Sequence, residues 1–437
     1  MDGARPAALA LPRGTTLDRA LAKPWFLAVW CMLAAFGTYA CMYGFRKPFT
    51  AGAFPAEYGG ATLKAWLITA QVLGYTISKL VGIRLIAEMT RARRLRVLLT
   101  LIAGAELAWL LLALAPPVLG PVFLLLNGLC LGLVFGLVLG FVEGRRMTEL
   151  FVAGLCASFI LADGFTKSVG AWLLQRGLEE HWMPATAGAL FALPLLLGAW
   201  MLSCIPAPST RDVAERHERV PLTRAERLSL LRRHGLGLGG VFLAYLAITI
   251  LRSVRADYAP ELWRALEVEA RPELFTRSEL LVALAVAAVS ASLALIRDHR
   301  RALAAALGFS AVALAIGLGA AAALRARHPH AFGWMVWLGF GLYTPYVLVH
   351  TSIFERWIAH TRERANVGFL MYVADTLGYA GYAAMMIAGG WLRSGSDFLG
   401  FFVALALSML GLALLGLLLS TRLLAGRRSA PGWLSAP

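Results

Sequence analysis

Long apolar stretches recur along this chain of 437 residues, from near its beginning to near its end. Each is about twenty residues long, enough for an α-helix to cross a bilayer core about 30 Å thick. Because lipid offers no hydrogen-bond partners, such a segment must satisfy its backbone internally, as an α-helix does. The sequence therefore predicts an all-α polytopic membrane protein with twelve transmembrane helices, near residues 25–45, 65–87, 95–115, 119–142, 149–174, 183–205, 236–256, 278–296, 302–324, 331–354, 365–391 and 398–421.

The composition excludes several classes of protein. The chain is 59% hydrophobic and only 15% charged, whereas soluble domains carry roughly a quarter charged residues. An ordinary soluble enzyme, a disordered chain and a fibrous repeat are therefore excluded. The net charge of +16 does not indicate nucleic-acid binding, because the basic residues lie in short connections between the apolar stretches. The five cysteines lie inside apolar stretches without a Cys-x-x-Cys pair, so we expect no disulfide framework, no metal and no cofactor.

The basic residues also predict the orientation in the membrane. They concentrate in every second connection, and connections rich in Lys and Arg stay in the cytoplasm. We therefore expect a multi-pass protein of the bacterial inner membrane with both termini in the cytoplasm. The basic residues on that side include Arg91, Arg93, Arg94, Arg96, Arg145, Arg146, Arg297, Arg300, Arg301, Arg356, Arg362, Arg364, Arg422, Arg427 and Arg428.

An internal repeat divides the chain into two halves. In span one Arg46 follows Tyr39 by seven residues, and in span seven Arg252 follows Tyr245 by the same spacing. Likewise, Asp163 follows Glu143 by twenty residues, and Asp375 follows Glu355 by twenty. Such repeats are common in transporters. They predict two pseudo-symmetric six-helix bundles, residues 1–205 and 236–437, joined by a charged cytoplasmic linker, residues 206–235.

Several ionisable residues fall inside the spans, where each costs a few kcal/mol unless it faces a partner or a cavity. Asp163 and Lys167 are four residues apart, so they can pair within one helix. That pair is either structural or has a role in gating or proton coupling. Asp257 lies near Arg255 and is expected to neutralise it. Asp375 joins Asp163, Lys167 and Arg255 as a candidate for gating or coupling.

Arg46, Lys79 and Arg252 have no acidic partner in their own helices. Together, from spans one, two and seven, they would form an anion site, because guanidinium groups bind phosphate or carboxylate in a bidentate manner. The alternative for Arg46 is an anchor at the membrane interface. It lines the cavity only if its helical segment continues past Pro48.

Three tyrosines in the same spans, Tyr39, Tyr43 and Tyr245, need partners for their hydroxyl groups and are candidate binding residues. Gln71 and His350 are possible further polar lining residues. Glycines spaced by four in span four, Gly128, Gly132, Gly136 and Gly140, predict close helix packing.

Twelve spans in two repeats with a charged central loop resemble the major facilitator superfamily of secondary transporters. Three segments are similar to the organophosphate:phosphate antiporters of that superfamily: Tyr43-Gly-Phe-Arg-Lys-Pro-Phe49, Gly74-Tyr-Thr-Ile-Ser-Lys79 and the stretch from Tyr245 to Arg252. The Phe-Arg-Lys-Pro-Phe-Thr segment also resembles an uncharacterised bacterial family of facilitator-like proteins, for which no substrate is implied.

The likeness to the antiporters implies that Arg46 and Arg252 hold a phosphate group and that Lys79 assists them. The chain departs from the antiporter pattern at Pro48, where those proteins have asparagine. It also departs in span five, where they have a histidine and this chain has Asp163 and Lys167.

We therefore expect a secondary active transporter, an antiporter that moves a small anionic solute by alternating access. The solute would be an organophosphate, phosphate or a carboxylate, and the protein a monomer without enzymatic activity. Two alternatives stay open. One is a proton-coupled exporter of hydrophobic or cationic solutes, with free carboxylates in its cavity. The other is a non-transporting sensor or assembly protein, with its arginines paired to Asp163 or Asp375.

The predicted orientation can be checked with a reporter enzyme that is active only in the periplasm. A fusion at Ser229, in the linker, is expected to be inactive, because the linker lies in the cytoplasm. Periplasmic activity from that fusion would reverse the predicted topology.

Overall fold

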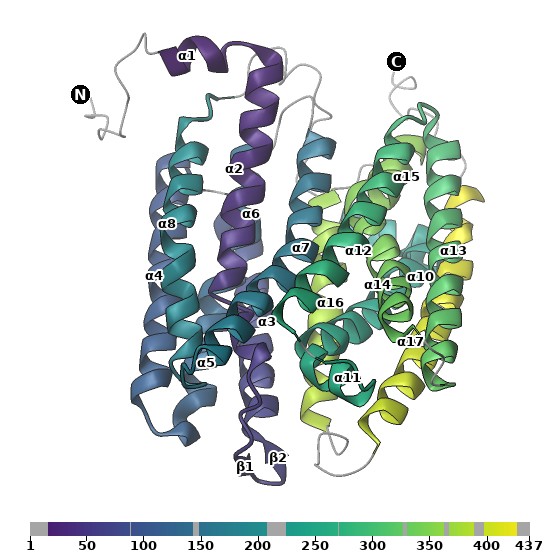
Figure 1. The fold of residues 1–437 in the computed structure, drawn as a ribbon. Coiled ribbons are helices and arrows are strands. Elements are labelled where there is room, and N and C mark those ends of the chain that lie inside the picture. The colour runs from purple at the N-terminus through teal and green to yellow at the C-terminus, as the bar shows by residue number, and fades with distance from the viewer. Residues whose placement is uncertain are drawn as a thin grey trace, which may run out of the picture.

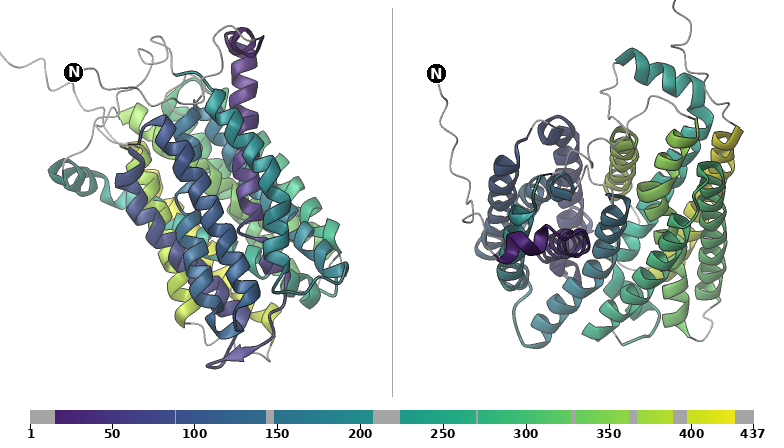
Figure 2. Two further views of the ribbon diagram at one scale, coloured as in Figure 1. Left: turned by 90° about the vertical axis from the view of Figure 1, so that its left-hand side faces the viewer. Right: turned by 90° about the horizontal axis from the view of Figure 1, so that it is seen from above.

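The computed structural model describes residues 16–87, 89–142, 148–207, 224–269, 271–326, 330–361, 367–388 and 397–425. Nearly all of this is helical, and the helices form two bundles that lie side by side (Figure 1). The view from above separates the two groups along the chain, purple to teal on one side and green to yellow on the other (Figure 2).

The first bundle contains the helices up to residue 204, together with a short antiparallel hairpin between α2 and α3 in which Glu57 pairs with Thr62. Its elements are α1 (Thr16–Leu21), α2 (Pro24–Gly44), the 3-10 turn η1 (Pro48–Ala51), β1 (Glu57–Tyr58), β2 (Ala61–Thr62), α3 (Leu63–Ala87), α4 (Arg91–Leu114), η2 (Pro117–Leu119), α5 (Gly120–Leu131), α6 (Val134–Val142), α7 (Thr148–Gln175) and α8 (Met183–Cys204).

The second bundle begins with the longest helix, α10 (Arg224–Asp257). Its further elements are α11 (Ala259–Ala265), α12 (Pro272–Ala294), α13 (His299–Arg325), α14 (Ala331–Leu348), the π-helical turn η3 (Val349–Ile353), α15 (Phe354–Thr361), α16 (Val367–Ala388), α17 (Phe398–Ser420) and the 3-10 turn η5 (Thr421–Ala425). Two of these helices begin at an aspartate whose carboxylate accepts a backbone N–H of the first turn: Asp298 caps α13 and Asp397 caps α17.

In the described part of the chain, helices occupy all twelve predicted ranges, and the clearest differences are in their extent. Span seven begins at Arg224, inside the predicted linker, and span ten continues through η3 and α15 to Thr361. Within the described residues, nine helical segments are long and apolar enough to cross a membrane, so the count of twelve spans stays a prediction. Most of the linker, residues 208–223, lies outside the described residues, as does Glu143 of the internal repeat.

The side chains on the outside of the bundles are apolar, as expected for a surface in contact with lipid. Large hydrophobic side chains that are more than half exposed include Trp25, Leu114, Leu193, Leu295 and Leu418. The β1–β2 hairpin and α11 lie at one end of the bundles, called here the hairpin end, and α1 lies at the opposite end (Figure 1).

Glycines permit the close crossing of α3 and α5 within the first bundle. A Cβ atom at Gly128 would lie 2.9 Å from the backbone nitrogen of Tyr75, and one at Gly132 would lie 2.6 Å from the Cβ of Ser78. This confirms the close packing predicted from the glycine spacing in span four. Between the bundles, α3 packs against α16 and α7 packs against α12. These are spans two and eleven and spans five and eight, so each half contributes its second and fifth spans to the central interface.

Candidate functional site

The helical path of span one is interrupted after 21 residues. Helix α2 ends at Gly44 and the turn η1 begins at Pro48, which leaves Phe45, Arg46 and Lys47 without regular helical structure. Proline has no N–H and is favoured at the first position of a helical turn, so Pro48 both ends one segment and begins the next. Interrupted helices at membrane depth are typical of transporter binding sites.

Buried side chains of neighbouring helices satisfy the backbone at this interruption. The carbonyl oxygen of Phe45 accepts hydrogen bonds from Trp109 Nε1 at 2.7 Å and from Asn127 Nδ2 at 3.1 Å. The carbonyl oxygen of Arg46 accepts a hydrogen bond from Gln71 Nε2 at 3.1 Å, and Gln71 also donates to Asn127 Oδ1 at 2.8 Å. Gln71 therefore supports the broken segment instead of lining a cavity with a free amide.

The segment past Pro48 is a short 3-10 turn and not a continuation of α2, yet Arg46 is buried inside the protein. Its side chain is 4% exposed. The guanidinium carbon lies 4.0 Å from the ring centroid of Tyr75, 5.7 Å from that of Tyr43 and 6.0 Å from that of Tyr379. Such distances allow cation–π attraction to the tyrosine rings.

Arg252 is the counterpart of Arg46 in the internal repeat, and it lies within helix α10 of the second bundle. It is 7% exposed, and its guanidinium carbon lies 4.5 Å from the ring centroid of Tyr346 and 5.7 Å from that of Tyr343. The charges of both Arg46 and Arg252 act on the hydroxyl groups of Tyr43 and Tyr379. The two arginines therefore lie around one group of tyrosines at the interface of the bundles.

Neither guanidinium group has a hydrogen bond or an ion pair with another described residue, and the Nε atoms of both are buried without a partner. A buried charge normally has a hydrogen-bonding partner of opposite charge, because desolvation is expensive. Arg46 and Arg252 thus retain unused capacity to bind an anion.

Lys79 differs from the two arginines, contrary to the sequence-based expectation of three uncompensated cations. Its ammonium group forms an ion pair with Asp375 of the other bundle, although the two residues are 296 positions apart in the chain. The Tyr245 hydroxyl donates to the second oxygen of Asp375, and His350 Nε2 lies 3.6 Å from that oxygen. The predicted binding residues Lys79 and Tyr245 and the predicted coupling residue Asp375 therefore meet in one cluster.

A second cluster lies closer to the hairpin end. Lys47 forms an ion pair with Asp257 of the other bundle and lies 3.8 Å from Asp163. Tyr382 donates a hydrogen bond of 2.9 Å to Asp257. Lys167 pairs with Asp163 within α7, as the spacing of four residues predicted.

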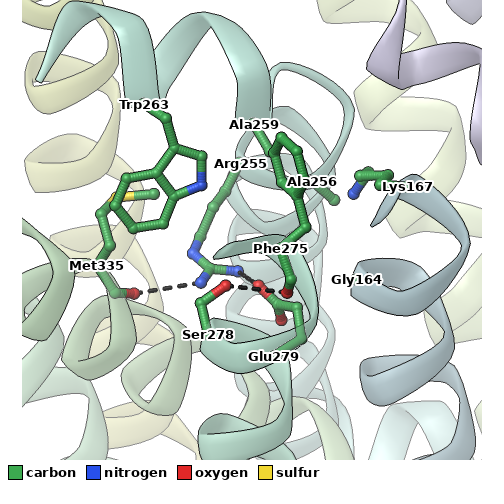
Figure 3. Close-up of a pocket in the computed structure, with 10 residues that line it drawn as sticks. All are labelled: Gly164, Lys167, Arg255, Ala256, Ala259, Trp263, Phe275, Ser278, Glu279 and Met335. Carbon is green, nitrogen blue, oxygen red and sulfur yellow. Dashed lines mark hydrogen bonds and ion pairs between the residues drawn. The ribbon is translucent and has the colours of Figure 1, made fainter. Parts of the chain in front are cut away.

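The expected neutralisation of Arg255 by Asp257 was wrong. Arg255 pairs instead with Glu279 of α12, at 2.7 Å, and donates to the carbonyl oxygen of Met335 at 3.2 Å. Residues two positions apart point to nearly opposite sides of an α-helix, so Asp257 faces the first bundle while Arg255 faces α12. Figure 3 shows the Arg255 guanidinium directed at Glu279, with Lys167 across the space between α7 and α12. The cavity there measures about 10 Å³, room for about one water molecule.

A further ion pair at the hairpin end was not predicted. Lys64, at the start of α3, forms an ion pair of 2.6 Å with Glu261 of α11 and donates to the carbonyl oxygen of Thr50 at 2.8 Å. The one feature of the sequence that singles out Lys64 is the rarity of lysine. The chain has five lysines, and all but Lys23 are buried in ion pairs.

The remaining predicted binding residues, Tyr39 and Tyr43, lie one helical turn apart on α2. Their rings are 5.7 Å apart, and Tyr39 also packs against Phe135 at 5.3 Å. They extend the tyrosine group around Arg46. Within the described residues no cluster of His, Cys, Asp and Glu side chains is arranged to hold a metal ion.

Counting the buried charges shows which residues remain uncompensated. Seven Lys and Arg side chains are buried in the described part of the chain. Five of them have a separate carboxylate partner each: Lys47–Asp257, Lys64–Glu261, Lys79–Asp375, Lys167–Asp163 and Arg255–Glu279. The two without a partner are Arg46 and Arg252, the pair related by the internal repeat.

Comparison with protein families identifies the chain. Residues 48–427 match the model of a family described as a family of unknown function, DUF5690. The chain belongs to the DUF5690 family. No curated protein matches this DUF5690 member.

Solved structures show what fold this DUF5690 chain has. A D-xylose–proton symporter is 13% identical, with a TM-score of 0.60 over 92% of this chain and 97% of that chain. The proton:xylose symporter XylE bound to 6-bromo-6-deoxy-D-glucose is also 13% identical, with a TM-score of 0.63 over 90% of this chain and 95% of that chain. A bacterial homologue of the human lysosomal transporter Spinster, inward-facing and unoccupied, is 13% identical, with a TM-score of 0.56 over 94% of this chain and 100% of that chain. The DUF5690 chain therefore has the major facilitator fold, as predicted, and is a polytopic membrane protein.

The ion pair between Lys79 and Asp375 can be tested by removing one partner and then both. Lys79→Met or Asp375→Asn alone is expected to lower the free energy of unfolding by about 3–5 kcal/mol, because the remaining group is left buried without a counter-charge. The double variant should lose less than the sum of the two single losses, since it leaves no lone charge. Unfolding of the purified protein in detergent measures these values. Additive losses would show that the two groups do not interact.

Proposed function

We propose that this protein is a secondary transporter that moves a small anionic solute by alternating access. The observation that carries the proposal is the excess of two positive charges, Arg46 and Arg252, among the buried groups that join the bundles. An anion bound between them would supply the missing counter-charge. Because one arginine comes from each bundle, the same anion would draw the bundles together.

The chemistry of the two groups favours phosphate, a phosphate ester or a carboxylate as the cargo. A guanidinium group presents parallel N–H donors that match the spacing of two oxygens in these anions. Tyrosine rings and hydroxyl groups surround both arginines, which suits a polar head with an organic part. The resemblance of three segments to organophosphate:phosphate antiporters supports the same solute class and exchange as the mode of transport.

The ion pairs between bundles suggest which contacts change during the cycle. Lys47–Asp257 and Lys64–Glu261 join the bundles towards the hairpin end. In the proposed orientation, with the termini in the cytoplasm, this end faces away from the cytoplasm. Opening towards the hairpin end would break both pairs. Asp163, Lys167 and Arg255 lie beside them and would act in gating.

Two observations favour this proposal over its alternatives. A proton-coupled exporter of cationic solutes needs a free carboxylate between the bundles, whereas the buried carboxylates described there, Asp163, Asp257, Glu279 and Asp375, each have a cationic partner. Glu106 has a buried oxygen without a partner, but it packs against Gly188 of α8 within the first bundle. A sensor without transport activity would have its arginines paired with Asp163 or Asp375. Those two aspartates pair with Lys167 and Lys79 instead.

The fold comparisons support transport as the activity, because the solved structures with this fold include a sugar–proton symporter and a Spinster homologue. Their cargo is a property of those proteins. The anionic cargo proposed for this chain rests on the chain's own two arginines. Because both arginines come from one chain, the protein would act as a monomer.

A thermal-shift screen of the purified protein tests the anion site. Phosphate, glucose 6-phosphate, succinate and neutral amino acids are the probes. A ligand at one hundred times its dissociation constant stabilises the folded protein by about 2.7 kcal/mol, so the matching anion is expected to raise the melting temperature by several degrees. Arg46→Ala and Arg252→Ala should each abolish that rise.

Arg176→Ala is the matched control, because Arg176 also lies over an aromatic ring, that of Trp172, but is exposed on the surface. This variant should respond to the anion as the parent does. Equal stabilisation of the parent and of both variants, Arg46→Ala and Arg252→Ala, would contradict the proposed site.

A further inference from the structure

His350 is the only histidine buried in the described part of the chain, with 7% of its surface exposed. It lies in the π-helical turn η3, four residues after Tyr346 and five after Pro345. Single π-helical turns inside α-helices are rare and occur frequently at functional sites. Neither the anion site nor the ion pairs at the hairpin end use this side chain.

The contacts of His350 define which nitrogen is available. Nδ1 lies 3.0 Å from the carbonyl oxygen of Tyr346, which can only accept, so Nδ1 carries the hydrogen. Nε2 lies 3.4 Å from the Tyr245 hydroxyl and 3.6 Å from Asp375 Oδ1. The Tyr245 hydroxyl donates to Asp375. In the neutral imidazole, Nε2 is therefore a free base that faces a carboxylate.

Asp375 thus lies between two possible counter-ions. Lys79 comes from α3 of the first bundle, while His350 belongs to the same bundle as Asp375. If α3 and α16 separate at this level, Lys79 leaves and Asp375 keeps only His350 beside it. A buried carboxylate without a counter-charge is costly. A proton on Nε2 would restore the charge balance, and histidine is the side chain that accepts a proton near neutral pH.

Among the described side chains in contact with Asp375, only Lys79 and His350 can carry a positive charge. Tyr245 and Tyr346 contribute neutral phenols from α10 and α14. From α7, the Cys156 thiol lies within the electrostatic reach of Asp375. The titratable residues of α13 all lie at its two ends, and Glu355 follows on α15. Arg252 lies over the Tyr346 ring at 4.5 Å, and Tyr379 lies beside Lys79 at 4.9 Å.

We propose that His350 is the proton-binding site of the transport cycle: it takes up one proton from water when Lys79 separates from Asp375 and releases it when the pair re-forms. The two states then differ by one bound proton, so the movement of the bundles is coupled to pH. This inference rests on the alternating movement proposed above but not on the anionic nature of the cargo.

Distance measurements between spin labels test the inference without any cargo. Labels are attached through an unnatural amino acid at Ser203 and Ser292, exposed positions near the ends of α8 and α12 that lie opposite the hairpin end. The parent protein is expected to gain a longer distance component between pH 8 and pH 5.5. His350→Gln, which keeps a polar group but cannot bind the proton, should give the same distances at both pH values.

His181→Gln is the control, because His181 is half-exposed beside Glu179 and far along the chain from Asp375; it should respond to pH as the parent does. Lys79→Met is expected to show the longer component at both pH values, since the pair cannot form. A parent without a pH response, or an unchanged response in His350→Gln, overturns the proposal. A response that depends on His350 in a protein stabilised by none of the anions would retain the proton site and refute the anionic cargo.

Discussion

One-to-one pairing of buried charges is the constraint on which this structure depends. A chain whose outside contacts lipid has no polar surface on which to place lysines, arginines and carboxylates from its spans. Five buried cations are neutralised by pairing with five carboxylates, and three of those pairs join one bundle to the other. The interface between the bundles is thus electrostatic as well as apolar, and its charges fix which helices meet.

The interruption of α2 connects the two charged clusters. Arg46 and Lys47 are neighbours in the same irregular segment, yet Arg46 lies among tyrosines while Lys47 reaches Asp257 in the other bundle. A regular helix would not allow both directions together with the hydrogen bonds from Trp109 and Asn127 to Phe45. Trp109 and Asn127 of the first bundle stabilise the irregular backbone, and the irregular backbone in turn allows Lys47 to reach the second bundle. In the proposed cycle, a movement of Arg46 on anion binding would therefore act directly on the ion pair between Lys47 and Asp257.

The sequence predicted the helical bundles, the repeat and the pairing of Asp163 with Lys167, because these depend on local periodicity or on residues in one helix. It also singled out Arg46 and Arg252 from the spacing they share. It did not predict that Asp375 neutralises Lys79, or that Lys47 and Lys64 reach the other bundle, since these partners are about 200 to 300 positions apart. Asn127 and Trp109 were missed for the same reason. Their role depends on where α2 breaks, and the proline that ends the break was the local signal.

The central claim is that Arg46 and Arg252 both lack a counter-charge and that a bound anion supplies it. The most direct measurement is an experimental structure of the protein with saturating tungstate, a heavy oxyanion that mimics phosphate in shape and charge. The account predicts density for the oxyanion between the two guanidinium groups, with oxygens within about 4 Å of both. Density confined to the protein surface, or an arginine found paired with a carboxylate of the protein, would contradict it.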